Sequence, residues 1–427
     1  VQGYLPLAQM PTWKTTRGGD RILPRSYLLR VFVLSDGRQG WRVLPGGLTR
    51  IATSELEIAS MQRGGSSADT WVQTEGEVDT TSLLHHDHPS VDTRHRTRMV
   101  TSRAAENLFW LGRYTERTEN ATRLARLTID SLNGEDASSQ PLLQWLGDLA
   151  VANALVHPAV PSPAQARRVF ERSLIAALAD TDAATSVGFN LRALRQAASA
   201  VRERLSLEQW NLIEHAQREF QRATAAGTRG GDYASLEALR ALETLSGLTA
   251  AMTGAQTDRM TRDDGWRLLS TGRHLERLAF LAQALGAAFD TGAVQDEAGF
   301  EAVVALFDST ITFHAQYQQR HDIPALVDLL VIDRDNPRSL GWVAQTLRGR
   351  LARLAGSGPG EMPPTADLVP DPRQWTLESL CQRDAEGRHA VLQQLLADCV
   401  DAAYRLSDDL TARYFAHSGD ARRSLGA

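Results

Sequence analysis

The stretch that decides the fold is Ser102-Arg-Ala-Ala-Glu-Asn-Leu-Phe-Trp-Leu-Gly-Arg-Tyr-Thr-Glu-Arg-Thr-Glu-Asn120. Its apolar residues recur at three- and four-residue intervals among strong helix formers, which predicts a long amphipathic helix. The same pattern continues from Thr101 to the end of the chain and is interrupted at Gly- and Pro-containing segments. These breaks fall at residues 133–134, 158–163, 227–231, 292, 335–337 and 356–372. The sequence therefore predicts an all-α bundle of roughly nine or ten helices.

A six-residue motif, Gly-Arg-x-x-Glu-Arg, occurs twice in this helical region, at residues 112–117 and again 160 residues later at residues 272–277. We interpret it as an internal repeat and predict a duplicated bundle. Helical spacing places Arg113 beside Glu116 and Arg117, so each copy is expected to hold an ion-paired stripe along one helix face. A glycine inside a helix costs about 1 kcal/mol relative to alanine, so its recurrence indicates close approach of another backbone.

The two copies are predicted to form one shared, buried or half-buried cluster, because leucines flank both motifs. Its expected members are Arg113, Glu116, Arg117, Arg273, Glu276 and Arg277. The cluster is either structural or a site that binds an anion, and a solvated, salt-bridged helix face is the simpler alternative. A third role, in which Glu116 and Glu276 form a carboxylate pair for acid–base work, is the weakest because the flanking arginines would keep both ionised.

A third unusual segment, residues 320–340, contains a short apolar helix that ends at Asp335-Asn-Pro337 and a restart at Ser339. Asp328 lies in the apolar stripe of this helix and needs a partner if it is buried. We expect that partner to be an arginine from one of the two motif copies. Asp328 is therefore counted with the cluster.

The first 75 residues are predicted to be β-rich. Residues 26–34 are rich in β-branched and aromatic side chains and precede the turn signal Asp36-Gly37, so residues 39–45 are the expected returning strand. Because so few strands bury too little surface to stand alone, we expect the tail of a larger domain. The chain also begins at Val1 rather than at a methionine, so we expect a fragment.

Residues 76–100 are polar and irregular and are interpreted as a linker. Within it, His85-His-Asp-His-Pro89 has no second cluster at a helical or hairpin spacing that could complete a metal site. A solvated linker is the favoured interpretation, and no metal site is predicted.

The composition argues against several classes of function. A formal net charge of −5 gives no overall basic field, which argues against nucleic-acid or anionic-membrane binding. Cys381 and Cys399 have no companion ligands for zinc, and no run of about 18 apolar residues or leader pattern occurs, so the cytoplasm is the expected location. Lys14 is the only lysine among 46 basic residues, so this chain alone cannot form a site that needs several lysines.

Three segments in order, residues 102–120, 264–277 and 327–340, together resemble the bacterial alpha-E domain. The N-terminal region is similar to the end of a circularly permuted ATP-grasp module, and the segments that carry this likeness are residues 8–13, 24–33, 42–50 and 60–71. The resemblances imply a C-terminal ATP-grasp portion at 1–75, a linker at 76–100 and an alpha-E domain with an internal repeat at 101–420. The expected fold class is mainly α, preceded by a small β-rich tail of an α+β domain.

The ATP-grasp resemblance implies an ATP-dependent carboxylate–amine ligase, in which an acyl phosphate forms and an amine then attacks it. It implies ATP and Mg²⁺ for the intact protein, a missing N-terminal ATP-grasp portion, and a peptide-like or amino-acid substrate. Arg30 and Arg50 are the expected catalytic residues, since they are placed to meet phosphates. One further segment is either a phosphate-binding nest of backbone N–H groups or a plain turn. It consists of Gln62, Arg63, Gly64, Gly65 and Ser66.

In such a ligase the alpha-E region has an accessory or substrate-binding role, and this chain alone is not expected to be active. The alternative is a non-catalytic helical scaffold that docks a partner enzyme, with a degenerate ATP-grasp remnant. No Ser-His-Asp order, HExxH motif or Walker loop is recognisable in residues 101–427.

Overall fold

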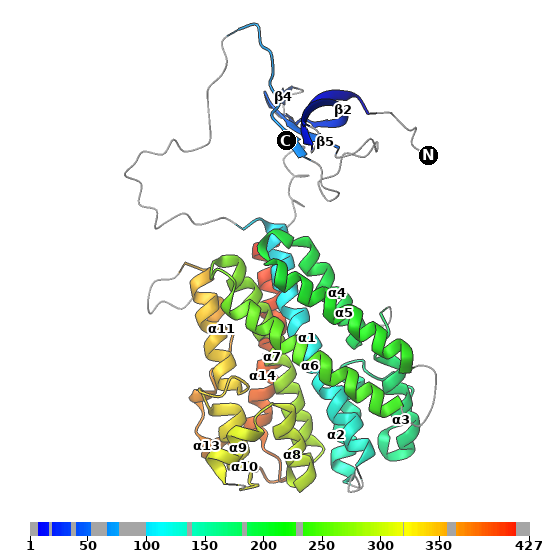
Figure 1. Cartoon of the computed structure of the whole chain (residues 1–427). Helices are drawn as coiled ribbons and strands as arrows, with labels where there is room; N and C mark the ends of the chain where they lie inside the picture. Colours follow the sequence, from blue (N-terminus) through cyan, green and yellow to red (C-terminus); the bar gives the residue numbers. More distant parts are fainter. Residues whose placement is uncertain are drawn as a thin grey trace. The chain divides into compact units, whose positions relative to one another are not determined.

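A computed structural model gives the fold of the chain. It describes residues 7–16, 19–35, 40–52, 66–76, 100–134, 139–181, 186–227, 234–318, 320–356 and 364–415. They form two compact units, one within residues 1–95 and one within residues 96–419 (Figure 1). The first is small and β-rich and the second is helical, so the expected class, mainly α with a small β-rich N-terminal part, is confirmed. The linker predicted at residues 76–100 lies almost entirely outside the described residues.

The β-rich unit contains two antiparallel sheets. Its strands are β1 (Gln9–Thr16), β2 (Gly19–Arg30), β3 (Val33–Ser35), β4 (Trp41–Val43), β5 (Leu48–Ile51) and β6 (Ser66–Ala68). The larger sheet has the order β1-β2-β5-β6, and β3 and β4 form a separate pair. The long strand β2 connects the larger sheet because its first half pairs with β1 and its last residues pair with β5.

The predicted hairpin is present, since Val33 of β3 lies opposite Val43 of β4. Its turn, at Asp36-Gly37, falls outside the described residues. The single strand predicted over residues 26–34 is wrong in its bounds. The strand breaks after Arg30, because Arg30 is the last β2 residue paired with β5, whereas Val33 already pairs with β4.

The helical unit has fourteen α-helices among the described residues. They are α1 (Ser102–Asn133), α2 (Gln140–Ala152), α3 (Pro163–Ala177), α4 (Val187–Ala200), α5 (Leu207–Gly227), α6 (Ala234–Asp258), α7 (Asp264–Asp290), α8 (Glu297–Leu306), α9 (Thr310–Tyr317), α10 (Ile323–Val327), α11 (Leu340–Leu354), α12 (Pro364–Asp367), α13 (Leu377–Cys381) and α14 (Ala390–Tyr414). Short helices such as α10, α12 and α13 raise the number above the nine or ten expected. A π-helix, Asp328–Ile332, directly follows α10.

Side-chain caps fix the starts of several helices. The Thr101 hydroxyl accepts a hydrogen bond from the backbone N–H of Ala104 at the start of α1. Ser339 caps α11 by accepting from the N–H of Trp342 at 3.0 Å, so the predicted restart at Ser339 is confirmed. Asp263 caps α7 in the same way, and this start was missed because no Gly or Pro separates α6 from α7.

Helices α1 and α7 form the centre of the helical unit. They pack against each other, and α4 and α6 also contact α1, while α11 and α14 also contact α7 (Figure 1). This position explains why α7 is buried around most of its circumference. Among the described residues, no helix combines the length and the apolar character needed to cross a membrane.

Two glycines let the central helices touch backbone to backbone. A Cβ atom on Gly112 would lie 2.0 Å from the carbonyl oxygen of Leu269, and one on Gly272 would lie 2.2 Å from that of Phe109. Both distances are shorter than any non-bonded contact allows, so no larger residue fits at either place. The close approach predicted from the repeated glycine is confirmed.

Candidate functional site

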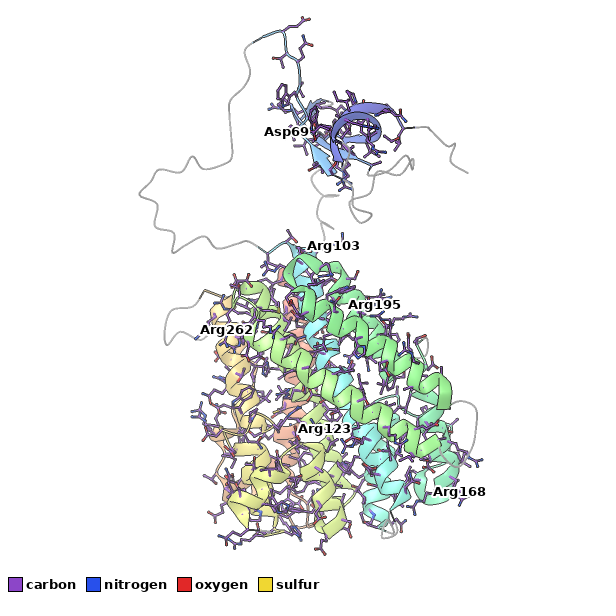
Figure 2. The ribbon with its side chains drawn as sticks, viewed as in Figure 1. Asp69, Arg103, Arg123, Arg168, Arg195 and Arg262 are labelled. Atoms are coloured by element: carbon purple, nitrogen blue, oxygen red, sulfur yellow. The ribbon has the colours of Figure 1, made fainter. Side chains whose placement is uncertain are left out.

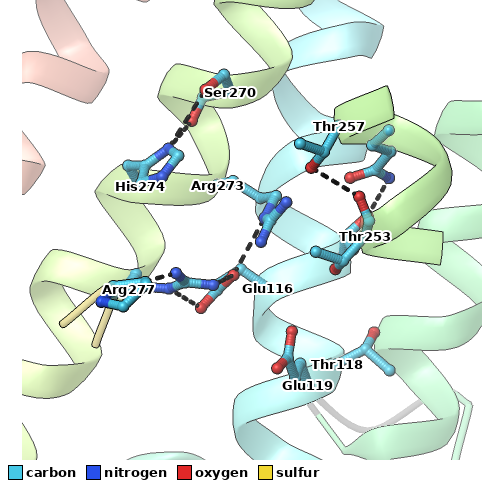
Figure 3. A network of polar contacts seen from close by, with 12 residues as sticks. Glu116, Thr118, Glu119, Thr253, Thr257, Ser270, Arg273, His274 and Arg277 are labelled. Carbon is cyan, nitrogen blue, oxygen red and sulfur yellow. Dashed lines mark hydrogen bonds and ion pairs between the residues drawn. The ribbon is translucent and has the colours of Figure 1, made fainter. Parts of the chain in front are cut away.

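The carboxylate of Glu116 lies at the centre of a buried ion-pair network. Arg277 donates to its two oxygens at 2.6 and 2.8 Å, in the bidentate geometry that favours arginine (Figure 3). Arg273, one turn earlier on α7, donates at 3.3 Å. Arg338, just before α11, contacts the same carboxylate at 3.4 Å and also pairs with Glu119. One glutamate of α1 is thus held by arginines from two other segments.

The second copy of the motif is arranged in the same way. Glu276 accepts from Arg117 at 2.8 and 2.9 Å and from Arg113 at 2.9 Å. Arg113 also donates to the Ser407 hydroxyl on α14 at 2.9 Å, and its guanidinium lies 4.9 Å from the centre of the Trp110 ring. Each glutamate therefore binds the arginines of the other copy.

The predicted ion-paired stripe within each helix is wrong for the motif itself. Arg113 bonds to Glu276 across the helix crossing rather than to Glu116 on its own helix. The glycine contact explains this, because backbones in contact bring side chains from facing helices closer than those one turn apart. Within α1, Glu119 does pair with Arg123, at 3.3 Å. Arg123, which is labelled in Figure 2, also pairs with Asp308 at 3.0 Å.

Both motif glutamates are held ionised. Burial alone would raise the pKa of Glu116, but the charges of Arg277, Arg338 and Arg273 outweigh it and hold that pKa well below its usual range. For Glu276, burial is likewise outweighed by Arg117 and Arg113, and its pKa is lowered. A carboxylate held this way cannot donate a proton near neutral pH, which argues against the acid–base role.

Asp328 is not part of this network. Its carboxylate accepts from the Tyr317 hydroxyl at 2.7 Å, so the expectation of an arginine partner is wrong. The cause is local: Tyr317 ends α9, and Asp328 directly follows the next helix, α10, only eleven residues later. Burial, followed by this hydrogen bond, raises the pKa of Tyr317.

A cavity of about 540 Å³ opens beside the Glu116 half of the network. Helices α6, α7, α9 and α11 contribute to its walls, together with the segments that precede α7, α9 and α11. Its lining residues are Thr253, Gln256, Thr257, Arg262, Trp266, Leu269, Ser270, Arg273, His274, Arg277, Asp308, Thr312, Asn336, Pro337, Arg338, Trp342 and Arg350. The motif arginines Arg273 and Arg277 therefore bind Glu116 and also line this cavity.

His274 and Gln256 are two residues of the cavity wall that carry acceptor atoms. His274 contacts the backbone oxygen of Ser270 through Nδ1 at 2.6 Å, which requires a proton on Nδ1 and leaves Nε2 as an acceptor (Figure 3). Burial, then the charges of Arg277 and Arg273, lowers the pKa of His274 to about 3. Gln256 is 1% exposed, and its Oε1 has no hydrogen-bond partner, although its Nε2 donates to Thr115.

The candidate catalytic residues of the β-rich unit lie on one face of its sheet. Arg30 lies opposite Leu48, and Arg50 lies opposite Leu28. Directly opposed residues of an antiparallel pair share a face, as do residues two apart on a strand, so Arg30 and Arg50 are diagonal neighbours. A Cβ atom on Gly47 would lie 2.7 Å from the backbone oxygen of Arg30, so this glycine allows β5 to begin beside β2.

The predicted phosphate loop is only partly described. Ser66 begins β6 opposite Ile51, one position away from Arg50, so it is on the other sheet face, and Ser67 lies opposite Arg50 instead. The other four residues, Gln62, Arg63, Gly64 and Gly65, fall outside the described residues, as does the His85–Pro89 segment.

One potential metal-ligand group was missed by sequence reasoning. Glu297 and Glu301, four apart on α8, approach His321 with ligand atoms within 4.8 Å of one another. All three are exposed, and Phe300 and Phe313 pack against the imidazole. Since exposed acidic groups commonly gather without an ion, we assign no metal here.

The cavity was also missed. Arg262, Arg350 and Trp342 belong to no motif, and they meet only because α11 packs against α7. Arg338 lay within the segment that carried the alpha-E resemblance, but its sequence position gave no indication that it reaches Glu116 from 222 residues away. The signal that could have directed attention to it is the excess of arginine over lysine, which is typical of buried ion pairs.

Comparison with known proteins identifies relatives of this chain. The chain is 26% identical over 409 residues to the uncharacterized protein Rv2567 of Mycobacterium tuberculosis, an alignment that covers 92% of this chain and 46% of that protein. It is 42% identical over 73 residues to the uncharacterized protein ML0605 of Mycobacterium leprae, covering 17% of this chain and 12% of that protein. The chain thus spans about half the length of the first relative. No solved structure matches it.

The helical unit provides the family assignment. Residues 100–415 match the Alpha-E family, described as a predicted alpha-helical domain with a conserved ER motif. Glu-Arg pairs occupy positions 116–117 and 276–277 of this chain, at the centre of the crossed network. The match covers most of the chain, and the chain belongs to the Alpha-E family.

Proposed function

We propose that this chain is the C-terminal part of a circularly permuted ATP-grasp protein, an ATP-dependent carboxylate–amine ligase with a peptide-like product. The helical unit has an accessory or substrate-binding role in this protein. ATP, Mg²⁺ and the nucleotide lysines belong to the N-terminal portion of the intact protein, because this chain has a single lysine. The observation that carries the proposal is the placement of Arg30 and Arg50 on one sheet face.

Two arginines on one face suit phosphoryl chemistry. Neither Arg30 nor Arg50 has a carboxylate partner among the described residues, and the buried Nε of Arg50 has no hydrogen-bond partner there. Unpaired guanidinium groups are suited to the oxygens of a transferring phosphoryl group or an acyl phosphate, where the main catalytic effect is electrostatic. Ser67 lies opposite Arg50 and adds a hydroxyl to the same face.

The test is ATP turnover by the intact protein with mixed amine and carboxylate substrates, measured as ADP release. We expect turnover that falls about 100-fold in Arg30→Gln or Arg50→Gln, the loss typical of removing one positioned charge. Arg42→Gln is the matched control, since Arg42 is an exposed arginine on β4 in the other sheet. Absence of ATP binding and turnover, or full activity in both variants, would contradict the proposal.

A second candidate function is a helical scaffold that docks a partner enzyme. It is favoured by the crossed network, in which Glu116 and Glu276 are already saturated by four motif arginines and Arg338. Such a network holds two helices together without any ligand. Glu276→Ala separates the two functions: lost stability with unchanged ATP turnover per folded molecule favours a scaffold.

We also propose that the helical unit arose by duplication of a smaller bundle. The support is that a shift of 160 residues exchanges equivalent contacts between α1 and α7. The contact of Gly112 with Leu269 corresponds to that of Gly272 with Phe109, and the pair Arg113–Glu276 corresponds to Arg273–Glu116. A local two-fold relation of this kind follows when one helix packs on its own copy.

A further inference from the structure

We infer that the cavity between α6, α7, α9 and α11 is a binding site for a small polyanion bearing phosphate or carboxylate groups. Nothing in the proposed ligase chemistry depends on this site, and the site stands whether or not the chain comes from a ligase. Two independent observations support the site: an excess of positive charge that includes two arginines without carboxylate partners, and a buried acceptor without a donor.

The charge around the cavity does not balance. Arg123, Arg273, Arg277 and Arg338 share the carboxylates of Glu116, Glu119 and Asp308 through the network described above. Arg262 and Arg350 also line the cavity. The network and the cavity wall together thus hold six arginines and three carboxylates, which leaves an excess of three positive charges. In a partly enclosed space of low dielectric, such an excess attracts an anion strongly.

Arg262 and Arg350 are held in place without a carboxylate. Their guanidinium carbons lie 5.1 and 4.5 Å from the centre of the Trp266 ring, and Arg350 also donates to the Ser270 hydroxyl at 3.2 Å. Neither has an ion-pair partner among the residues that the structure describes. Burial, followed by the charges of Arg353, Arg262 and Arg267, lowers the pKa of Arg350. Like charges held this close oppose folding, and a bound anion relieves that repulsion.

The second observation is Gln256, a residue of the cavity wall whose buried Oε1 has no hydrogen-bond partner among the described residues. A buried acceptor left unsatisfied costs about 1–3 kcal/mol, so native structures rarely retain one unless a ligand or water serves it. His274 adds a second acceptor through Nε2, a few residues away on α7. A ligand that carries an N–H or O–H donor as well as its oxyanion groups matches these two acceptors.

The cavity size restricts the ligand to a small molecule. About 540 Å³ is within the range of roughly 300–1,000 Å³ found for small-molecule sites. Three uncompensated charges match a di- or trianion rather than a single carboxylate. Trp266 and Trp342 provide apolar walls for the carbon skeleton or sugar between those groups.

Isothermal titration calorimetry of the full chain at low salt tests the site, with sodium pyrophosphate as the phosphate probe and tricarballylate as the carboxylate probe. We expect saturable binding of at least one probe, about tenfold weaker in Arg350→Gln and in Arg262→Gln. Arg405→Gln is the matched control, because Arg405 is exposed on α14 and lines no part of the cavity. Binding of pyrophosphate alone identifies a phosphate-bearing ligand, and binding of tricarballylate alone a carboxylate.

Failure of the site and failure of the ligase proposal are distinguishable. Neither Arg262 nor Arg350 makes an ion pair in the network, so both variants fold, which circular dichroism checks. If neither probe binds, or if both bind equally well to the wild type and to Arg350→Gln, the inference is overturned. A protein that binds the probe but never turns over ATP retains the site and loses only the ligase.

Discussion

Glu116 on α1 and Glu276 on α7 hold equivalent positions in the two motif copies, and each accepts its hydrogen bonds from the arginines of the other copy. The exchange is possible because Gly112 and Gly272 bring the two helix backbones into contact beside them. The two halves differ in their surroundings. The side chain of Glu116 is fully buried and has a third arginine, whereas that of Glu276 is 15% exposed.

This difference predicts unequal effects of removing the two charges. Glu116→Gln leaves Arg273 and Arg277 buried without their anion, which should lower the free energy of unfolding by about 3–5 kcal/mol. Glu276→Gln should cost less, because solvent reaches its partners. Chemical denaturation measures both, with Glu243→Gln, an exposed glutamate on α6, as the control. Equal losses at positions 116 and 276 would show that burial does not set the energy of the pairs.

The helix crossing predicts that even a methyl group is excluded from its centre. Gly112→Ala would place a Cβ atom 2.0 Å from a backbone oxygen of α7, which cannot move without displacing the helix. We expect a loss of about 3 kcal/mol or more in unfolding free energy, at the upper end of overpacking effects. Gly247→Ala on α6 is the control, since a Cβ there meets nothing within 4 Å and should stabilise the helix. Equal behaviour of the two variants in thermal unfolding would refute the close crossing.

The pairing of Asp328 with Tyr317 predicts a measurable cost for losing one hydroxyl. Tyr317→Phe leaves the half-buried carboxylate without its donor, and we expect the unfolding free energy to fall by about 1–3 kcal/mol. Tyr404→Phe serves as the control, because Tyr404 is exposed and, within the described part of the chain, its hydroxyl accepts a single long hydrogen bond, 3.5 Å from Gln283. If Tyr317→Phe is as stable as that control, Asp328 has another partner in solution.

His274 predicts how stability depends on pH. Its folded pKa of about 3 lies below the usual value of 6.5, so the unfolded chain binds more protons between these two pH values. The free energy of unfolding therefore falls as pH drops below 6.5, by up to about 1.4 kcal/mol per pH unit from this group. His274→Asn keeps a donor toward Ser270 but does not titrate, so it should flatten the decline between pH 6.5 and 5.

The control for this pH series is His215→Asn, which replaces an exposed histidine on α5. The lower limit of pH 5 avoids titration of Glu116, whose depressed pKa makes its own contribution disappear only at more acidic pH. A decline that is as steep in His274→Asn as in the wild type would show that His274 is not held neutral by its neighbours.

The sequence was sufficient for the elements whose signals are local. Apolar periodicity predicted the long helices, and the repeated glycine predicted the close crossing, because both depend on residues within a few turns of one helix. The sequence did not predict the partners of the ion pairs, because these depend on which helix lies opposite. Arg113 has suitable glutamates both on its own helix and on α7, and the close approach of the two helices decides between them.

For the same reason, the sequence predicted neither the cavity nor the partner of Asp328. Arg262, Arg350 and Gln256 come from three different elements, and no spacing in the sequence relates them. Tyr317 was overlooked as a partner of Asp328 because the turn that brings them together contains a residue with left-handed backbone, Gln318, that is neither glycine nor asparagine.

We infer that the arginines of the helical unit divide into a structural set and a ligand-binding set. The most direct measurement is the ligand-free unfolding free energy of Arg277→Gln beside that of Arg350→Gln. We predict a loss of about 3–5 kcal/mol for Arg277→Gln, which breaks the bidentate pair with Glu116, and little or no loss for Arg350→Gln, which relieves like-charge repulsion. Equal losses in the two variants would contradict the division.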